Sequence, residues 1–303
     1  MTNWMVTALW ILVVLVCFFV VIMIIDGNRF RVVSYEIVSD KLKKDYCFVL
    51  LADLHNKRYG AGNRKLIAAI ENCAPDAVFI AGDLLTSKPE VPYDAAAELA
   101  QELGRRYRVF YGMGNHEARL FRYPQVYGDM GATYEEVLNR AGIKLMKNTT
   151  EDLDESIQVT GLDIDRSYYK RFTPKPMEKD YLEDTLGMTN PDKFRILIAH
   201  NPDYFPDYAR WGADLVLSGH IHGGVIRLPL LGGVASPAIR FFPRYDGGRY
   251  VEGRSTMLLS RGLGMHTIPV RIFNPGELVV FHLRPDKGGS TSKTGEKQDG
   301  NTR

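Results

Sequence analysis

Five apolar segments of this chain each end in residues that commonly bind metal ions. The segments are 46–52, 77–81, 108–112, 194–199 and 215–217. The residues that follow them are Asp53 and His55, Asp83, Asn115 and His116, His200, and His220 and His222. Five of the 7 histidines therefore fall just after an apolar segment. Imidazole and oxygen ligands without cysteine are typical of sites for Mn, Fe, Zn or similar divalent ions.

The five segments predict buried strands, because each is a short apolar run bounded by glycine or polar residues. Between them, apolar residues recur with helical spacing, as at Leu66, Ile67 and Ile70. Helices are expected over 63–72, 93–103 and 133–141, and further strands over 157–161, 256–260 and 277–281. This alternation is typical of an α/β fold with a largely parallel sheet, where sites form at the carboxyl ends of the strands. The segment 163–193 is expected to be irregular, and 228–248 to be a Gly/Pro-rich loop.

Each strand-end residue also has an ordinary structural explanation. An Asp after an apolar strand is often a turn or helix-cap residue, and a histidine pair on a glycine loop can simply be exposed. A metal site is favoured because all five strand ends have ligand-type residues. The other two histidines, His266 and His282, are expected to be an ordinary loop residue and an ordinary strand residue.

Composition narrows the possible functions. The net charge of +2 argues against a strongly basic surface for nucleic acid. The 3 cysteines, Cys17, Cys47 and Cys73, have no CxxC spacing, so neither a disulfide framework nor a zinc ribbon is indicated. The sequence gives no sign of an obligate protein partner.

The N-terminal segment 4–25 has no charged residue. Its about 22 residues would span roughly 33 Å as a helix, enough for the hydrocarbon core of a membrane. A cleaved signal peptide is the alternative, but it would have a charged start, a shorter apolar region and small residues at its end. Basic residues follow the segment at Arg29, Arg31, Lys41, Lys43 and Lys44. By the positive-inside rule, they favour a single-pass anchor with a cytoplasmic C-terminal body.

The order of the ligand blocks resembles the calcineurin-like metallophosphoesterase superfamily. The blocks are Asp53-x-His55, Gly82-Asp83, Gly114-Asn115-His116-Glu117, His200 and Gly219-His220-x-His222. The apolar N-terminal segment and the run 223–229 resemble the branch of membrane-anchored bacterial phosphodiesterases, some of which hydrolyse UDP-2,3-diacylglucosamine. The resemblance implies an α/β fold, a four-layer α-β-β-α sandwich preceded by one transmembrane helix. We expect an anchor within 1–30, a metallophosphoesterase domain over 45–284 and a disordered polar tail over 285–303.

The resemblance also implies a role for each ligand-type residue. Asp53, His55 and His222 would bind one divalent ion, and Asn115, His200 and His220 a second, with Mn favoured. Asp83 would bridge the two ions, which fits the need of such a pair for a shared anionic ligand. Asn115 and His116 would be the catalytic pair. His116 would stabilise charge on the phosphoryl group or protonate the leaving oxygen; its alternative role is support of the ligands.

Three functions remain open from the sequence. The first is a membrane-anchored phosphoesterase that cleaves a phosphodiester or pyrophosphate bond in a lipid-linked or nucleotide-sugar substrate. It is favoured by the apolar loop 228–234 and by Arg227 and Arg261, which could contact phosphate or headgroups. Packing over the core and a solvated face are the ordinary explanations of these features. The second function is an extracytoplasmic enzyme for cell-wall or soluble phosphoesters, and the third is a non-catalytic scaffold.

Overall fold

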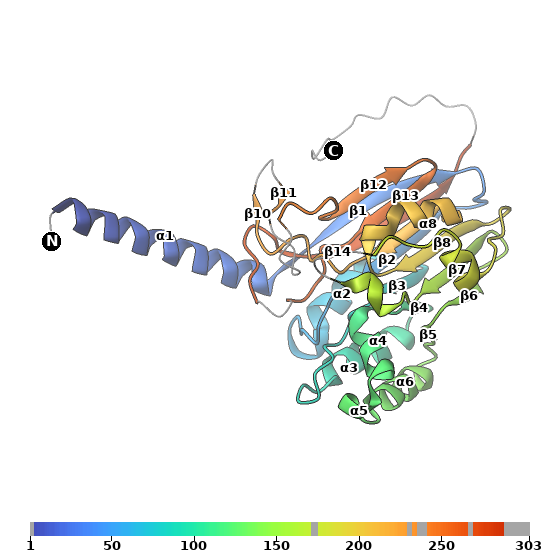
Figure 1. Ribbon diagram of the computed structural model, residues 1–303, viewed down its shortest axis with the longest axis horizontal. Helices are drawn as coiled ribbons and strands as arrows, with labels where there is room; N and C mark the ends of the chain where they lie inside the picture. Colours follow the sequence, from blue (N-terminus) through green and yellow to red (C-terminus); the bar gives the residue numbers. More distant parts are fainter. Residues whose placement is uncertain (1–2, 171–174, 229–231, 235–240, 266–268, 288–303) are drawn as a thin grey trace.

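Two mixed β-sheets pack face to face in the described part of the chain (Figure 1). The computed structural model describes residues 3–170, 175–228, 232–234, 241–265 and 269–287. The first sheet has the order β1 (Phe30–Ser39), β14 (Gly276–Pro285), β2 (Tyr46–Leu51), β3 (Ala77–Ala81), β4 (Val109–Gly112) and β5 (Leu145–Met146). The second has the order β12 (Gly248–Glu252), β13 (Ser255–Leu259), β9 (Leu215–Ser218), β8 (Phe194–Ala199), β7 (Ile157–Leu162) and β6 (Thr149–Asp152).

Helices cover the outer face of each sheet. Those on the first sheet are α2 (Arg64–Cys73), α3 (Asp94–Gly104), α4 (Asn115–Arg122), α5 (Pro124–Tyr127) and α6 (Met130–Arg140). Those on the second are α7 (Tyr181–Leu186) and α8 (Phe205–Trp211). Short 3-10 turns are η1 (Ala61–Asn63), η2 (Arg166–Tyr169) and η3 (Pro202–Tyr204), and β10 (Arg227–Leu228) pairs with β11 (Gly232–Gly233). The four-layer α/β sandwich expected from the sequence is therefore confirmed.

Strand β2 shows why the sandwich has three hydrophobic layers. Side chains alternate between the two faces of a strand. Phe48 and Leu50 lie in the core between the two sheets, whereas Val49 and Leu51 lie in the core beneath the helices. All four are fully buried. A strand that is covered on both faces must be apolar at every position, and this explains the unbroken apolar run.

The sheets position the strand ends for a site. Strands β2, β3 and β4 are parallel neighbours in the first sheet, and β8 and β9 are parallel neighbours in the second. Parallel strands end at the same edge of a sheet, so the loops that follow them lie together. These loops, together with the first turn of α4 after β4, carry every ligand block found in the sequence.

The first sheet begins earlier than the expected domain boundary at residue 45. β1 pairs in parallel with β14 from Phe30↔Gly276 to Ser39↔Pro285. β1 is an edge strand whose residues are exposed or partly buried except for the buried Ile37, so it lacks the continuous apolar run that marks the central strands. The segment expected to be irregular contains η2 and α7. His266 and residues 288–303 of the expected polar tail lie outside the described residues.

Helix α1 (Asn3–Asn28) projects from one end of the sandwich (Figure 1). Its apolar side chains are exposed, and by length and composition it could cross a membrane. Its last turn differs, because Asp26 and Gly27 are buried against the domain. Only Arg29 separates α1 from β1.

Candidate metal centre

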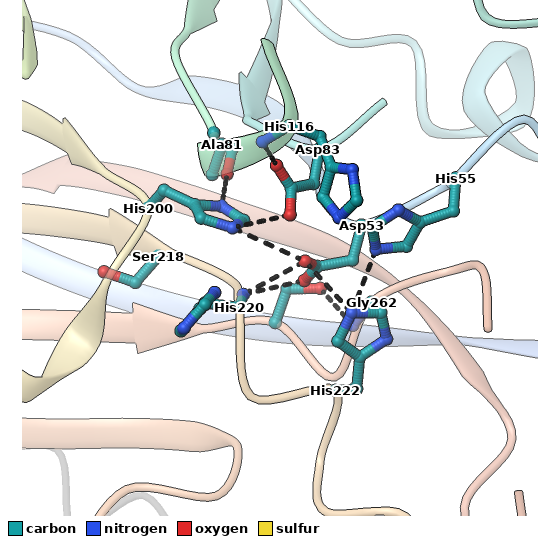
Figure 2. Close-up of polar contacts among 12 residues, drawn as sticks. Asp53, His55, Ala81, Asp83, His116, His200, Ser218, His220, His222 and Gly262 are labelled. Carbon is teal, nitrogen blue, oxygen red and sulfur yellow. Dashed lines mark hydrogen bonds and ion pairs between the residues drawn. The ribbon is translucent and has the colours of Figure 1, made fainter. Parts of the chain in front are cut away.

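Six of the seven predicted ligands converge at the ends of β2, β3, β8 and β9 (Figure 2), and the seventh, Asn115, is the first residue of α4 after β4. Two groups have ligand atoms within 4.8 Å of one another: Asp53, His55 and His222, and Asp83, His200 and His220. The sequence-based assignment also separates Asp53, His55 and His222 from His200 and His220, but it adds Asn115 to the second set and makes Asp83 a bridge, and these roles stay a prediction. The two groups also meet, since His200 Nε2 lies 3.1 Å from Asp83 Oδ2 and 3.7 Å from Asp53 Oδ1.

Five of these ligands have left-handed backbone conformations. The φ angles are 50° at Asp53, 49° at His55, 53° at Asp83, 75° at His220 and 55° at His222. Positive φ is uncommon outside glycine, and Asp and His are among the residues that tolerate it best. Each such residue costs on the order of 1–3 kcal/mol, and such strain clusters at functional sites. The loops therefore turn sharply at the ligands and aim them inward.

Backbone groups hold both carboxylates in place. The His220 N–H donates to Asp53 Oδ2 at 2.9 Å, and the His116 N–H donates to Asp83 Oδ1 at 2.8 Å. Gly114 packs directly on Asp83, where any Cβ would overlap the carboxylate. A larger residue at this position would displace Asp83, which explains the glycine before Asn115.

His200 shows how strongly the centre attracts a cation. Its Nδ1 lies 2.6 Å from the Ala81 carbonyl oxygen, so Nδ1 carries the proton that it donates there. Its Nε2 therefore points an electron pair at Asp83 and Asp53 when the ring is neutral. Burial lowers the pKa of His200, but the Asp83 carboxylate outweighs burial and raises the pKa to about 10. A positive charge between His200 and the carboxylates is thus strongly favoured.

His55 and His220 favour the neutral form that binds metals. Burial, together with nearby histidines, lowers the pKa of His55 well below its ordinary value and that of His220 to about 3. His55 Nε2 and His222 Nε2 lie 3.1 Å apart, and their rings are stacked. Burial raises the pKa of Asp53, but His222 and His200 outweigh it and hold the carboxyl ionised.

These residues fit divalent metal ions. Within the described residues, no hydrogen-bond donor reaches the buried Oδ1 of Asn115. An unsatisfied buried oxygen is costly, and coordination of a cation would satisfy it. Neutral imidazoles, ionised carboxylates and an amide oxygen are the ligand set of Mn, Fe or Zn sites.

His116 has a different hydrogen-bond arrangement from the other histidines. Ser87 donates its backbone N–H to His116 Nδ1 at 2.8 Å, and the Ser87 hydroxyl lies 2.9 Å from the same atom. An N–H can only donate, so Nδ1 is the acceptor and the neutral ring carries its proton on Nε2. His116 also belongs to a third group of possible ligands, with His55 and Asp83. A protonated Nε2 suits a hydrogen-bond donor better than a metal ligand.

Glu117 is a supporting residue that the sequence analysis did not select. It is fully buried, and its carboxylate accepts the backbone N–H groups of Asp83 at 2.8 Å, Leu84 at 2.9 Å and Gly114 at 3.1 Å. The Tyr111 hydroxyl donates to it at 2.8 Å. Burial and the Asp83 charge raise the pKa of Glu117 to about 7. Its place three residues after Gly114, as in a capping box, is the sequence signal that could have identified it.

The two arginines expected to contact substrate, Arg227 and Arg261, both interact with other residues of the domain. Arg227 Nη1 donates to the carbonyls of Gly223 at 2.8 Å and Asp246 at 2.9 Å. Arg261 is largely buried, with Nε 3.6 Å from Glu277 Oε2. Contact of either arginine with a substrate stays a prediction.

Tyr169, the last residue of the 3-10 turn η2, packs against one predicted ligand. The ring centroids of Tyr169 and His220 lie 5.2 Å apart.

The end of α1 is hydrogen-bonded to one ligand loop directly and to a second through Asn274. The Asp26 carboxylate accepts the Asn274 N–H at 2.9 Å, and Asn274 Nδ2 donates to the His222 carbonyl at 2.7 Å. On the other side, the Lys57 ammonium donates to the Gly27 carbonyl. Lys57 lies two residues beyond His55, so α1 contacts the loop of His55 directly and the loop of His222 through Asn274.

Comparison with known proteins agrees with this fold and site. The family of calcineurin-like phosphoesterases matches residues 48–224, which include every predicted ligand. The chain belongs to this family and is a metal-dependent phosphoester hydrolase. The superfamily predicted from the sequence is therefore confirmed, and the family uses divalent metals.

Several relatives share most of this chain. An uncharacterized metallophosphoesterase of Campylobacter jejuni is 29% identical over 85% of this chain and 64% of its own length. YkuE of Bacillus subtilis, also an uncharacterized metallophosphoesterase, is 27% identical over 73% of this chain and 72% of its own length. A transmembrane protein with a metallophosphoesterase domain from Danio rerio is 28% identical over 84% of this chain and 57% of its own length. The chain thus spans less than two thirds of two of these relatives.

Proposed function

We propose that this hydrolase is anchored in a membrane by α1 and cleaves a phosphodiester or pyrophosphate bond near the bilayer surface. The substrate class is lipid-linked or nucleotide-sugar phosphoesters, such as UDP-2,3-diacylglucosamine. The observation that carries the proposal is the short distance along the chain from α1 to the ligand loops, with the Lys57–Gly27 contact two residues from His55. A spanning α1 would hold these loops next to the headgroups.

The metal-binding roles follow from the two ligand groups. Asp53, His55 and His222 would hold one ion, and His200, His220 and Asn115 the other, with Asp83 shared. We propose Mn²⁺ at both positions. Two bound ions would supply Lewis acidity, polarising the phosphoryl oxygens and making a water nucleophile available near neutral pH.

The chain itself would supply orientation and hydrogen bonding. His116 would donate a hydrogen bond from its Nε2–H to the oxygen on which charge develops, because Nδ1 already accepts a hydrogen bond from the Ser87 N–H. Among the roles that the sequence left open for His116, which also include support of the ligands, this arrangement favours charge stabilisation over proton transfer. Glu117 would keep the loop after β3 in register, so that Asp83 stays between the two ion positions.

The orientation in the membrane is part of the proposal. Arg29 and Arg31 directly follow α1, and the positive-inside rule favours a cytoplasmic domain. A reporter fused to the C-terminus tests this. A periplasmic or extracellular reporter signal would favour the second function, an enzyme for cell-wall or soluble phosphoesters.

A substrate screen tests the function. Full-length protein in detergent, loaded with Mn²⁺, is assayed against UDP-2,3-diacylglucosamine, phospholipids and the soluble diester bis-p-nitrophenyl phosphate. Turnover is expected for the wild type, and Asp83→Asn should abolish it. Asp192→Asn, a control substitution at an exposed residue, should retain it. Absence of turnover in all assays, with metal bound, would instead support the non-catalytic scaffold.

Metal stoichiometry tests the ligand assignment. His220→Ala and His222→Ala are each expected to remove about one metal equivalent, because the two side chains belong to different ligand groups. Elemental analysis of the purified variants measures this. Loss of the same ion from both variants would show that the assignment is wrong even if the protein hydrolyses phosphoesters.

A further inference from the structure

Exposed aromatic residues that the metal centre does not use include one that contacts α1. Phe273 contacts Phe19 of α1, with ring centroids 6.4 Å apart. Phe241 and Phe242 are also exposed, at 70% and 61% of their surface, and so is Leu228. We call Leu228, Phe241, Phe242 and Phe273 the apolar rim.

Backbone pairing joins the members of the rim into one surface. Ile272, which precedes Phe273, accepts the Arg227 N–H at 3.0 Å. The Val234 N–H donates to Ile226, and the Phe242 N–H donates to Val234 at 2.9 Å. Segments paired in this way lie about 4.8 Å apart, so the rim residues belong to adjacent segments. Figure 1 places this region, marked by β10 and β11, at the end of the domain from which α1 projects.

The position of Phe273 along α1 indicates its depth in a membrane. Phe19 precedes the end of the apolar run at Ile25 by six residues, about 9 Å along a helix axis. Phe273 therefore lies beside a part of α1 that would be inside the bilayer. Interfacial apolar surfaces are buried roughly 5–10 Å deep at the boundary of headgroups and acyl chains, which matches this position.

The backbone presents two rim residues in an unusual conformation. Phe242 has φ 49° and Phe273 has φ 53°. Positive φ is a true outlier for a bulky residue. These two aromatic side chains are exposed all the same, so the folded chain holds them outward without using them in its own core.

We propose that the apolar rim docks into the same bilayer that α1 spans, so that the domain lies on the lipid surface. The proposal rests on membrane anchoring by α1. The rim continues the lipid-facing surface of α1 through the Phe19–Phe273 contact. The Asp26 and Asn274 hydrogen bonds then connect this docked end to His222, so the metal centre would be held at a fixed height above the lipid. A substrate whose phosphate lies in the headgroup layer would reach the centre without leaving the membrane.

Fluorescent labelling of the full-length protein in lipid nanodiscs tests the docking. Single cysteines are introduced by Phe273→Cys, Phe241→Cys and, as a control of similar exposure on α5, Val126→Cys, in a background without Cys17, Cys47 and Cys73. An environment-sensitive dye on the rim positions should emit at shorter wavelength and be quenched by spin-labelled lipids, and the dye on residue 126 should not. Rim emission equal to that of residue 126 would overturn the proposal.

The native Cys17 separates failure of the docking from failure of the anchor. A variant that retains only Cys17 reports whether α1 lies in lipid. Quenching at Cys17 without quenching at the rim contradicts the docking alone, whereas no quenching at either contradicts the anchoring on which it rests. A rim shielded from water but not quenched by lipid, with cross-links between copies, would show that a second chain covers the surface and would also overturn the proposal.

Activity provides a second measurement. Phe241→Asp should lower turnover of a phospholipid substrate in vesicles but leave turnover of bis-p-nitrophenyl phosphate unchanged. Equal effects on both substrates would contradict a role of the rim in docking.

Discussion

Asn274 Nδ2 donates to the backbone carbonyl of His222 at 2.7 Å, and its own N–H donates to Asp26 at the end of α1. The Asn274 side chain is fully buried and also bonds the Gly224 carbonyl at 2.5 Å. One amide group thus fixes both sides of the turn that carries a predicted metal ligand. The same residue links this turn to the N-terminal helix.

Asn274→Ala is expected to weaken binding of the ion held by Asp53, His55 and His222. Residues that orient metal ligands typically contribute about 10–100-fold to metal affinity. Calorimetric titration of the metal-free protein with Mn²⁺ measures the effect. Asn190→Ala, which removes a side-chain bond to a backbone N–H in an exposed turn, is the matched control. Reduced thermal stability with unchanged metal affinity would mean that Asn274 is only structural.

His116→Ala is expected to lower kcat by about 10²–10³, the usual cost of losing one donor to developing charge. Metal content should stay at the wild-type value, because Nδ1 accepts from Ser87 and the proton lies on Nε2. Steady-state kinetics with elemental analysis provide both readouts. Ser87→Ala is the control, since it keeps the backbone donor and should have a much smaller effect. Release of an ion by His116→Ala would identify His116 as a ligand instead.

Glu117→Ala is expected to destabilise the protein and reduce metal binding together. The substitution leaves the buried N–H groups of Asp83, Leu84 and Gly114 without their acceptor. Each unsatisfied buried group costs about 1–3 kcal/mol. Thermal unfolding and metal titration of the full-length protein measure the two effects. Glu136→Ala, which removes only an exposed helix ion pair, should stay within about 0.5 kcal/mol. A similar small effect at Glu117 would contradict its supporting role.

Asp214 should make the stability of the domain depend on acidic pH. Burial raises its pKa, but hydrogen bonds from Arg195 and Lys41 outweigh burial and lower the pKa. A lowered folded-state pKa adds stability above the unfolded value of about 3.9, and this stability is lost as the pH falls through the folded pKa. The difference in melting temperature between wild type and Asp214→Asn should therefore be largest near pH 7 and shrink below about pH 4. The exposed Asp192→Asn is the control, and a difference independent of pH would contradict this account.

The central strands and the candidate ligand residues could be recognised in the sequence because their signals are local. Strand β3 is covered on both faces, so all of its residues are apolar and the sequence predicts the strand. Asp83 lies two residues after the end of this strand, with only Gly82 between them. Ligand chemistry depends on residue type, and parallel topology brings the strand ends together. The edge strand β1 has no such run. One of its sides faces solvent, so its sequence does not have to be apolar at every position.

The sequence by itself determined the family, the α/β architecture and the set of ligand-type residues, since these depend on residue types in a fixed order. The tertiary structure decided which ring nitrogen of His116 carries the proton and which hydrogen bonds hold the ligand loops in place. The proton on His116 depends on a backbone N–H at Ser87, 29 positions away. The bond from Asp26 to Asn274 joins residues 248 positions apart. Such contacts depend on how the chain brings distant backbone groups together, and no local pattern of residues encodes them.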